Sequence, residues 1–148
     1  MPVLPIIRRA AGADLDVVYA MICALEDQQL DKDVFSKVYL RNLTSPDIAY
    51  FLADVEEKTV GMVSCHIQGL LHHAALVAEI QEMFVYADYR SQRIGETLMT
   101  RVVQHAILEG AAQLEVTSRA TRHAAHRFYE REGFIKSHVK LVRYLDKI

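Results

Sequence analysis

The chain has 148 residues, which is the length of one ordinary domain and leaves little room for two independent cores. Its composition is 51% hydrophobic and 24% charged with a net charge of −2, so it lacks the basic excess of a general nucleic-acid binder. No apolar run approaches the ~20 residues of a membrane span, and the first residues lack a signal-peptide pattern, so we expect one cytoplasmic domain over residues 1–148 without membrane or nucleic-acid partners.

The first 47 residues predict one strand and two helices. Val3–Arg9 has the apolar pattern of a strand. Asp14 is a typical helix N-cap, and the apolar residues that follow it through Leu25 recur at helical spacing. Asp33–Leu43 shows the same spacing, and Ser45-Pro46-Asp47 is expected to end this second helix.

Three strands are expected next. Ile48–Val55 and Thr59–Ile67 are rich in β-branched and aromatic residues, and the short polar connection between them predicts a hairpin. After a loop that contains His72 and His73, Leu76–Tyr86 is predicted as a third strand. The two cysteines, Cys23 and Cys65, lie in segments predicted to be buried, where a free thiol behaves as a small hydrophobe.

The rest of the chain alternates helix and strand. Gln92–Glu109 is the clearest helix, with an apolar stripe on one side. Leu114–Ser118 is predicted as a strand, His123–Glu132 as a short helix and Ser137–Leu145 as the last strand. The whole chain therefore predicts a mixed α/β fold with the order β-α-α-β-β-β-α-β-α-β.

A strand runs through a polar turn directly into a helix between Met83 and Met99. The first turn of such a helix presents unpaired backbone N–H groups and the positive end of the helix dipole, which attract a phosphate or diphosphate. Arg90, Ser91, Gln92 and Arg93 would line this turn. The alternative is a plain structural corner with a solvated basic turn.

A second motif, Ala125–Phe134, is a short helix that ends at Gly133. Its spacing places Phe128 in the core and Tyr129 beside it, where the phenol could face a crevice. A single tyrosine in such a helix is usually a packing residue. Its hydroxyl becomes a catalytic candidate where a leaving thiolate is within hydrogen-bond reach, because the two groups can exchange a proton.

These two motifs, in this order and separated by one strand, resemble the GNAT acetyltransferase family. The family's acetyl-CoA loop, Arg/Gln-x-x-Gly-x-Gly/Ala, falls on residues 90–95, with Arg93 in place of the first glycine. Arg122 stands where many members have asparagine. The resemblance implies the GNAT fold, acetyl-CoA as cosubstrate, and coenzyme contacts from Phe84, Val85, Arg90, Ser91, Gln92, Arg93, Ile94, Gly95, Glu96 and Thr97.

A closer resemblance covers nearly the whole chain. The segments VYAMICALE, GMVSCHIQ, LHH, EIQE and RHAAHRFYEREGF are similar to GNAT enzymes that acetylate small amines bearing a phosphonate. This resemblance implies that Glu79 is the general base and Tyr129 the general acid. It supports the class of reaction better than the identity of the acceptor.

An alkyl ammonium must lose a proton before or while it attacks the thioester, which is the role expected of Glu79. Glu82 is three positions further along, and a regular strand would point the two carboxylates to opposite faces unless a bulge intervenes. Attack by the amine itself needs no covalent enzyme intermediate. Cys65 is therefore expected to be a core residue, not a nucleophile.

A phosphonate acceptor would require cationic or hydrogen-bonding partners. The candidates for substrate binding are His66, His72, His73, Glu82, Arg119, Arg122 and His123. His72 and His73 with Glu79 could alternatively hold a divalent metal, a possibility that metal removal followed by an assay would test. The resemblance also implies a possible homodimer, although no residue identifies an interface.

Two other functions remain open. The same fold could acetylate a polyamine, an antibiotic amine or a protein amine. A non-catalytic acyl-CoA-binding sensor would keep the phosphate loop and perform no transfer. Retention of both Glu79 and Tyr129 counts against the sensor.

Overall fold

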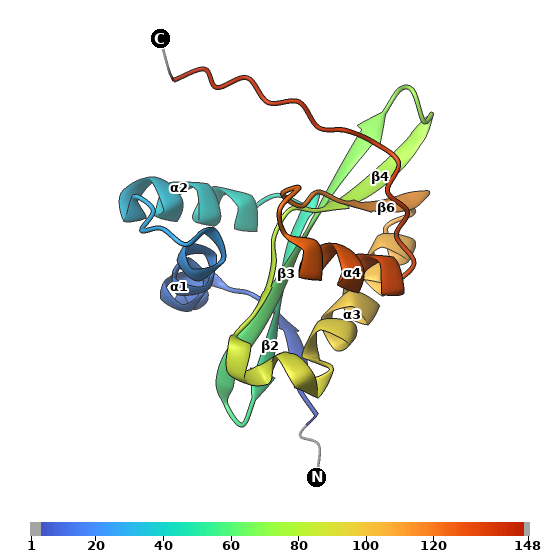
Figure 1. Cartoon of the computed structure of the whole chain (residues 1–148). Helices are drawn as coiled ribbons and strands as arrows, with labels where there is room; N and C mark the ends of the chain where they lie inside the picture. Colours follow the sequence, from blue (N-terminus) through green and yellow to red (C-terminus); the bar gives the residue numbers. More distant parts are fainter. Residues whose placement is uncertain (1–3, 147–148) are drawn as a thin grey trace. The chain divides into compact units, whose positions relative to one another are not determined.

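The computed structural model describes residues 4–146 (Figure 1). Between Val116 and Thr117 the chain divides into two compact units, which are described separately below. A single domain over residues 1–148 therefore stays a prediction. Val3, the expected start of the first strand, lies outside the described residues.

The first unit is built around a six-stranded mixed sheet with the order β1-β2-β3-β4-β6, and β5 pairs with β3 beside β4. All pairs are antiparallel except β4 with β6. The strands are β1 (Ile6–Arg9), β2 (Ile48–Val55), β3 (Lys58–Leu70), β4 (Ala75–Ile80), β5 (Met83–Val85) and β6 (Gln113–Val116). The predicted strand Leu76–Tyr86 is thus two strands with a break at residues 81–82.

Helices cover both faces of this sheet, with α1 and α2 on one side and α3 on the other (Figure 1). The alternation of side chains along β2 explains the arrangement: Tyr50 and Leu52 belong to the apolar cluster shared with α1 and α2, whereas the Phe51 ring meets His105 of α3. The bounds are α1 (Leu15–Glu26), α2 (Lys32–Leu43) and α3 (Ile94–Leu108), with short 3₁₀ turns at Gly12–Asp14 and Ala87–Gln92. Of the helices described, none is long and apolar enough to cross a membrane.

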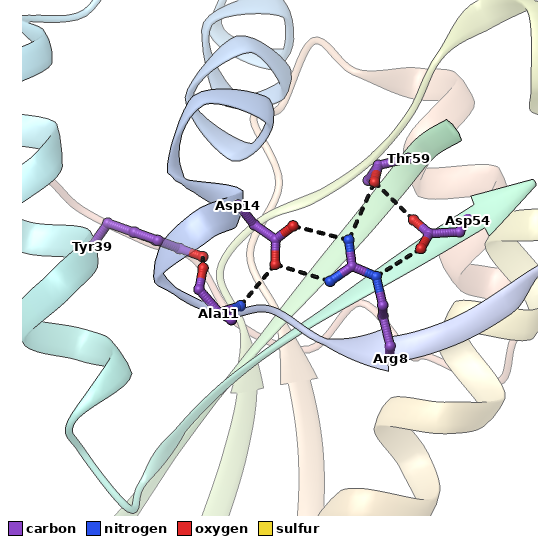
Figure 2. A network of polar contacts seen from close by, with 6 residues as sticks. All are labelled: Arg8, Ala11, Asp14, Tyr39, Asp54 and Thr59. Atoms are coloured by element: carbon purple, nitrogen blue, oxygen red, sulfur yellow. Dashed lines mark hydrogen bonds and ion pairs between the residues drawn. The ribbon is translucent and has the colours of Figure 1, made fainter. Parts of the chain in front are cut away.

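A polar network joins β1, β2 and β3 to the start of α1 (Figure 2). The Arg8 guanidinium donates to both carboxylate oxygens of Asp14 at 2.9 Å and to Asp54 at 2.6 Å. Asp14 also accepts from the Ala11 N–H at 2.8 Å, and Thr59 donates to Asp54 at 2.7 Å. Asp14 takes the expected N-cap position. Its side chain accepts hydrogen bonds from Arg8 and Ala11 and does not cap α1. The hydrogen bond from Arg8 holds the pKa of Asp14 below its usual value.

The second unit contains α4 (His123–Arg131), which matches the predicted short helix. The predicted last strand, Ser137–Leu145, is wrong, because these residues form neither helix nor strand. Ile135, Val139 and Leu141 are between 84% and 90% exposed. A strand needs hydrogen bonds to a neighbour, and no described strand pairs with this segment. The observed order is β-α-α-β-β-β-β-α-β-α, and the predicted mixed α/β class is confirmed.

Candidate active site

The two candidate carboxylates lie on one face of the sheet because a bulge separates them. Glu79 of β4 pairs with His66 of β3, whereas the Glu82 carbonyl accepts from the Ser64 N–H two residues earlier on β3. Three steps along one strand thus oppose two along the other, which leaves Gln81 as the extra residue of a β-bulge. The regular alternation that would separate the carboxylates is therefore absent, and both occupy the sheet face that carries Tyr50.

A cavity of about 550 Å³ lies between α1, α2 and this face of the sheet. Its wall is mostly apolar and aromatic, with Phe35 and Tyr39 contributed by α2. Among the described residues, Asp31 and Glu82 are the only aspartate or glutamate that line it, and no lysine or arginine does. The Asp31 carboxylate caps α2 by accepting from the Val34 N–H at 3.0 Å. Glu82 is therefore the carboxylate that the sheet contributes to this cavity, whereas Asp31 belongs to the start of α2.

Glu82, His66 and Tyr50 share the floor of the cavity. The edge of the His66 ring approaches Tyr50, with centroids 6.5 Å apart, and Asn42 donates to the Tyr50 hydroxyl at 2.7 Å. Burial raises the pKa of Tyr50, and the negative charge of Glu82 adds to the rise. Two predicted substrate-binding residues, His66 and Glu82, are thus brought together. Sequence reasoning missed Tyr50 and Asn42, because no motif marks them and they meet only when α2 packs over the sheet.

Glu79 is half-buried and is the next-to-last residue of β4. The register places it between His66 of β3 and Glu115 of β6. His72 and His73 lie in the turn between β3 and β4, with ring centroids 4.3 Å apart, and neither lines the cavity. Within residues 4–146 no group of three or more potential ligands is arranged for a metal ion, so the suggested site of His72, His73 and Glu79 is not found.

One edge of β5 has no strand beside it among the described residues. β6 pairs with residues 77–80 only, and in the described chain no strand covers the edge of β5 opposite β3. The Ser64 N–H bonds the Glu82 carbonyl and the Tyr86 N–H bonds the Val60 carbonyl, so in antiparallel alternation Phe84 also faces β3, and Val85 faces the open edge. The Arg90 guanidinium donates to the Val85 carbonyl at 2.8 Å.

The predicted phosphate loop leads into the first turn of α3. Arg93 is the N-cap and has a left-handed backbone, with φ 62° and ψ 20°, at the position where the family pattern has glycine. The side chains of residues 90–93 are exposed, whereas Ile94 is fully buried in the core. Ile94, Gly95 and Glu96 therefore present first-turn backbone N–H groups that have no helical partner. The Thr97 N–H already bonds the Arg93 carbonyl at 3.1 Å.

The remaining candidates belong to the second unit. The Tyr129 ring packs against Phe128 and Phe134, with centroid distances of 5.5 and 5.7 Å. Burial raises the pKa of Tyr129, so its phenol stays protonated at neutral pH. Arg119 and His123 are exposed. The roles of these three residues stay predictions.

Comparison with known proteins decides the family. Residues 17–134 match the sequence model of the acetyltransferase (GNAT) family. The chain belongs to the GNAT acetyltransferase family. It is 40% identical to an aminoalkylphosphonate N-acetyltransferase of Salmonella typhimurium over 145 residues, which cover 98% of this chain and 94% of the relative. It is also 30% identical to an uncharacterized N-acetyltransferase of Archaeoglobus fulgidus, over 83% of this chain and 88% of that protein.

Solved GNAT structures have the same fold. An aminoglycoside N-acetyltransferase in complex with CoA superimposes with a TM-score of 0.87 over 98% of this GNAT chain and 97% of its own, at 15% identity. At this identity the likeness shows the fold alone. With the family match and the N-acetyltransferase relatives, the chain is an acetyl-CoA-dependent amine N-acetyltransferase.

Proposed function

We propose that this enzyme acetylates a small-molecule amine by direct transfer, with an aminoalkylphosphonate as the first candidate acceptor. The observation that supports this acceptor is the 40% identity to the Salmonella aminoalkylphosphonate N-acetyltransferase across 98% of the chain. Segments that contain both proposed catalytic residues, Glu79 and Tyr129, fall within the matched region.

Acetyl-CoA supplies the activated thioester, and this chain supplies two sets of backbone groups to hold it. We assign the open edge of β5, at Val85, to the pantetheine arm and the first turn of α3, residues 94–96, to the diphosphate. Arg90, Ser91, Gln92 and Arg93 surround that turn with polar and cationic side chains. Phe84 directs its backbone groups to β3, so its contribution would come through its side chain.

The proton transfers are assigned to Glu79 and Tyr129. The ammonium nitrogen gives one proton to Glu79 as it forms a bond to the acetyl carbon, and the Val85 N–H would stabilise the negative charge on the carbonyl oxygen. The C–S bond then breaks as the nitrogen loses its second proton to solvent, and Tyr129 protonates the departing thiolate and regains a proton from solvent. A covalent intermediate is unnecessary. Burial raises the pKa of Cys65 to about 11, which makes this thiol a poor nucleophile near neutral pH.

A second class of acceptor is favoured by the cavity beneath α1 and α2. Its charged lining groups are the carboxylates of Asp31 and Glu82, and aromatic rings form much of the wall. Carboxylates and aromatic faces attract ammonium groups, and a phosphonate would be repelled from Glu82. A polyamine or an antibiotic amine would therefore fit this cavity better than the phosphonate end of the first candidate.

The experiment that tests both is a thiol-release assay with acetyl-CoA and a panel of amines. Aminomethylphosphonate and 1-aminoethylphosphonate represent the first class, and spermidine, an aminoglycoside and a lysine peptide represent the alternatives. The highest kcat/KM for a phosphonate would support the first candidate, and the highest value for a cationic amine would replace it. Absence of thiol release with every amine, combined with calorimetric binding of acetyl-CoA, would favour the acyl-CoA sensor.

The cytoplasmic location and the homodimer stay predictions. Light scattering of the purified chain would test the dimer directly. A monomer at assay concentrations would refute the predicted homodimer.

A further inference from the structure

Ser64 is a polar residue buried in the core of the first unit, with 0% of its surface exposed. It lies on β3 opposite Tyr50 of β2 and opposite the bulge between β4 and β5. A buried hydroxyl is costly unless its hydrogen-bonding capacity is used. The partners of this hydroxyl therefore indicate why a serine occupies an otherwise apolar position.

The Ser64 hydroxyl uses its full capacity at the bulge. Its oxygen accepts from the Gln81 N–H at 3.2 Å and from the Glu82 N–H at 2.8 Å. It lies 2.7 Å from the Glu82 Oε1, to which it donates. One donor and two acceptor positions are all that a hydroxyl has, so a single side chain satisfies both amides and one carboxylate oxygen.

These bonds explain how the bulge persists in a buried sheet. The extra residue of a bulge takes backbone groups out of the regular ladder, and here two of them are recovered by Ser64. Because of the bulge, the Glu82 side chain lies on the same face of the sheet as Glu79. Ser64 thus fixes both the backbone and the carboxylate of Glu82.

The Glu82 carboxylate is held by one oxygen only. Ser64 bonds Oε1, whereas Oε2 receives no hydrogen bond from the described residues, and Glu82 lines the cavity beside His66 and Tyr50. We propose that Ser64 is a positioning residue that aims the free oxygen of Glu82 at the ammonium group of the acceptor. This inference rests on the proposed acetyl transfer to a small amine.

The test compares the effect of one substitution on the KM of the amine with its effect on the KM of acetyl-CoA. In Ser64→Ala the KM of the amine rises about tenfold, the effect expected when a charge-assisted contact loses its orientation, whereas the KM of acetyl-CoA changes less than twofold. Cys65→Ala is the matched control, because Cys65 is the next residue of β3, is also 0% exposed and points to the opposite face. It should leave both KM values within twofold.

A double-mutant cycle shows whether Ser64 acts through Glu82. In a Glu82→Ala background, Ser64→Ala should change the amine KM by less than twofold. An undiminished tenfold effect in that background would overturn the proposal, as would equal effects of Ser64→Ala and Cys65→Ala on both KM values. If Ser64→Ala fails to fold, Ser64→Cys keeps the volume with a much weaker hydrogen-bonding group and is expected to give the same selective rise.

Failure of the proposed function has a different signature. Wild-type protein that releases no thiol with any amine would refute acetyl transfer to these acceptors. Calorimetric titration of spermidine and aminomethylphosphonate into the wild type and Ser64→Ala then tests the inference alone. Weaker amine binding by the variant supports it, and equal binding, or no amine binding by the wild type, overturns it.

Discussion

At the scale of single residues, Glu79 differs from the neighbouring Glu115 in position and not in residue type. Glu79 and Glu115 are register partners on adjacent parallel strands, so both lie on the same face of the sheet. Only Glu79 sits on the strand that continues through the bulge into the proposed pantetheine edge. This gives a catalytic candidate and a control of the same chemistry one strand apart.

Glu79→Gln should lower kcat by about 10²- to 10⁴-fold, since that is the usual contribution of a general base. Coenzyme binding should change little, because no coenzyme contact is assigned to this side chain. Steady-state kinetics and calorimetry measure the two effects. Glu115→Gln, the control, should retain kcat within about threefold of the wild type. Equal losses in both variants would remove Glu79 from the role of base.

Arg93 carries backbone strain at the entry to α3. Its φ of 62° is costly for a residue with a Cβ and free of that cost for glycine. A cationic side chain at a helix N-terminus is also unfavourable in the absence of an anion. Arg93→Gly should therefore stabilise the coenzyme-free protein by about 0.5–1 kcal/mol in urea unfolding. Arg90→Gly, at a position without positive φ, should not stabilise it, and a destabilised Arg93→Gly would contradict the strain argument.

At the scale of elements, the Arg8 network links the first strand to the first helix, and its strength depends on pH. The folded-state pKa of Asp14 is lowered, chiefly by the hydrogen bond from Arg8. A carboxyl with a lowered pKa stabilises the fold above its unfolded pKa of roughly 3.9, and this contribution is lost as the pH falls through the folded-state pKa. The network is therefore a source of acid sensitivity.

Arg8→Met should cost about 2–3 kcal/mol of unfolding free energy at pH 7, because it leaves Asp14 and Asp54 without their shared partner. The cost should shrink as the pH falls through the lowered pKa of Asp14, since this carboxyl then becomes protonated. Urea unfolding at pH 7 and in acid measures the difference. Lys32→Met, which removes an exposed ion pair to Asp16, should change the unfolding free energy far less than Arg8→Met does, because exposed ion pairs contribute little to stability. A pH-independent cost for Arg8→Met would refute the linkage.

The elements show what the sequence could and could not predict. The β2 bounds agree because the segment is rich in strand-forming residues such as Tyr50, Phe51 and Val55 and is flanked by turn signals. Glu56 and Glu57 both adopt the positive φ of a tight hairpin. The sequence alone could not predict the break between β4 and β5. The hydroxyl that stabilises this break comes from Ser64, which is 18 residues away from Glu82. Residues 137–145 have strand composition, but a strand also requires an available edge. The local sequence pattern reveals neither the distant hydroxyl of Ser64 nor whether a sheet edge is available to residues 137–145.

At the scale of the whole molecule, the residues proposed for catalysis and coenzyme binding are distributed along most of the chain. Glu79, the open edge of β5 and the start of α3 come from the first unit, whereas Tyr129 comes from the second. The motifs and the family resemblance led us to expect roles for both groups, and these roles stay predictions. The cavity residues Tyr50 and Asn42 were not predicted, because their importance follows from the packing of α2 over the sheet and no local motif marks them.

Coenzyme binding should stabilise the native molecule as a whole, since the assigned contacts exist only in the folded state. At 100 times its Kd, acetyl-CoA should add about 2.7 kcal/mol and raise Tm accordingly. Gly95→Pro removes a backbone N–H from the first turn of α3, where proline is tolerated better than in a helix interior, so it should fold but lose most of this Tm shift. Gly95→Ala keeps the N–H and matches an alanine that the family pattern accepts, so it should keep the shift. A full shift in Gly95→Pro would show that the diphosphate is held elsewhere, because the amide assigned to it would then be dispensable.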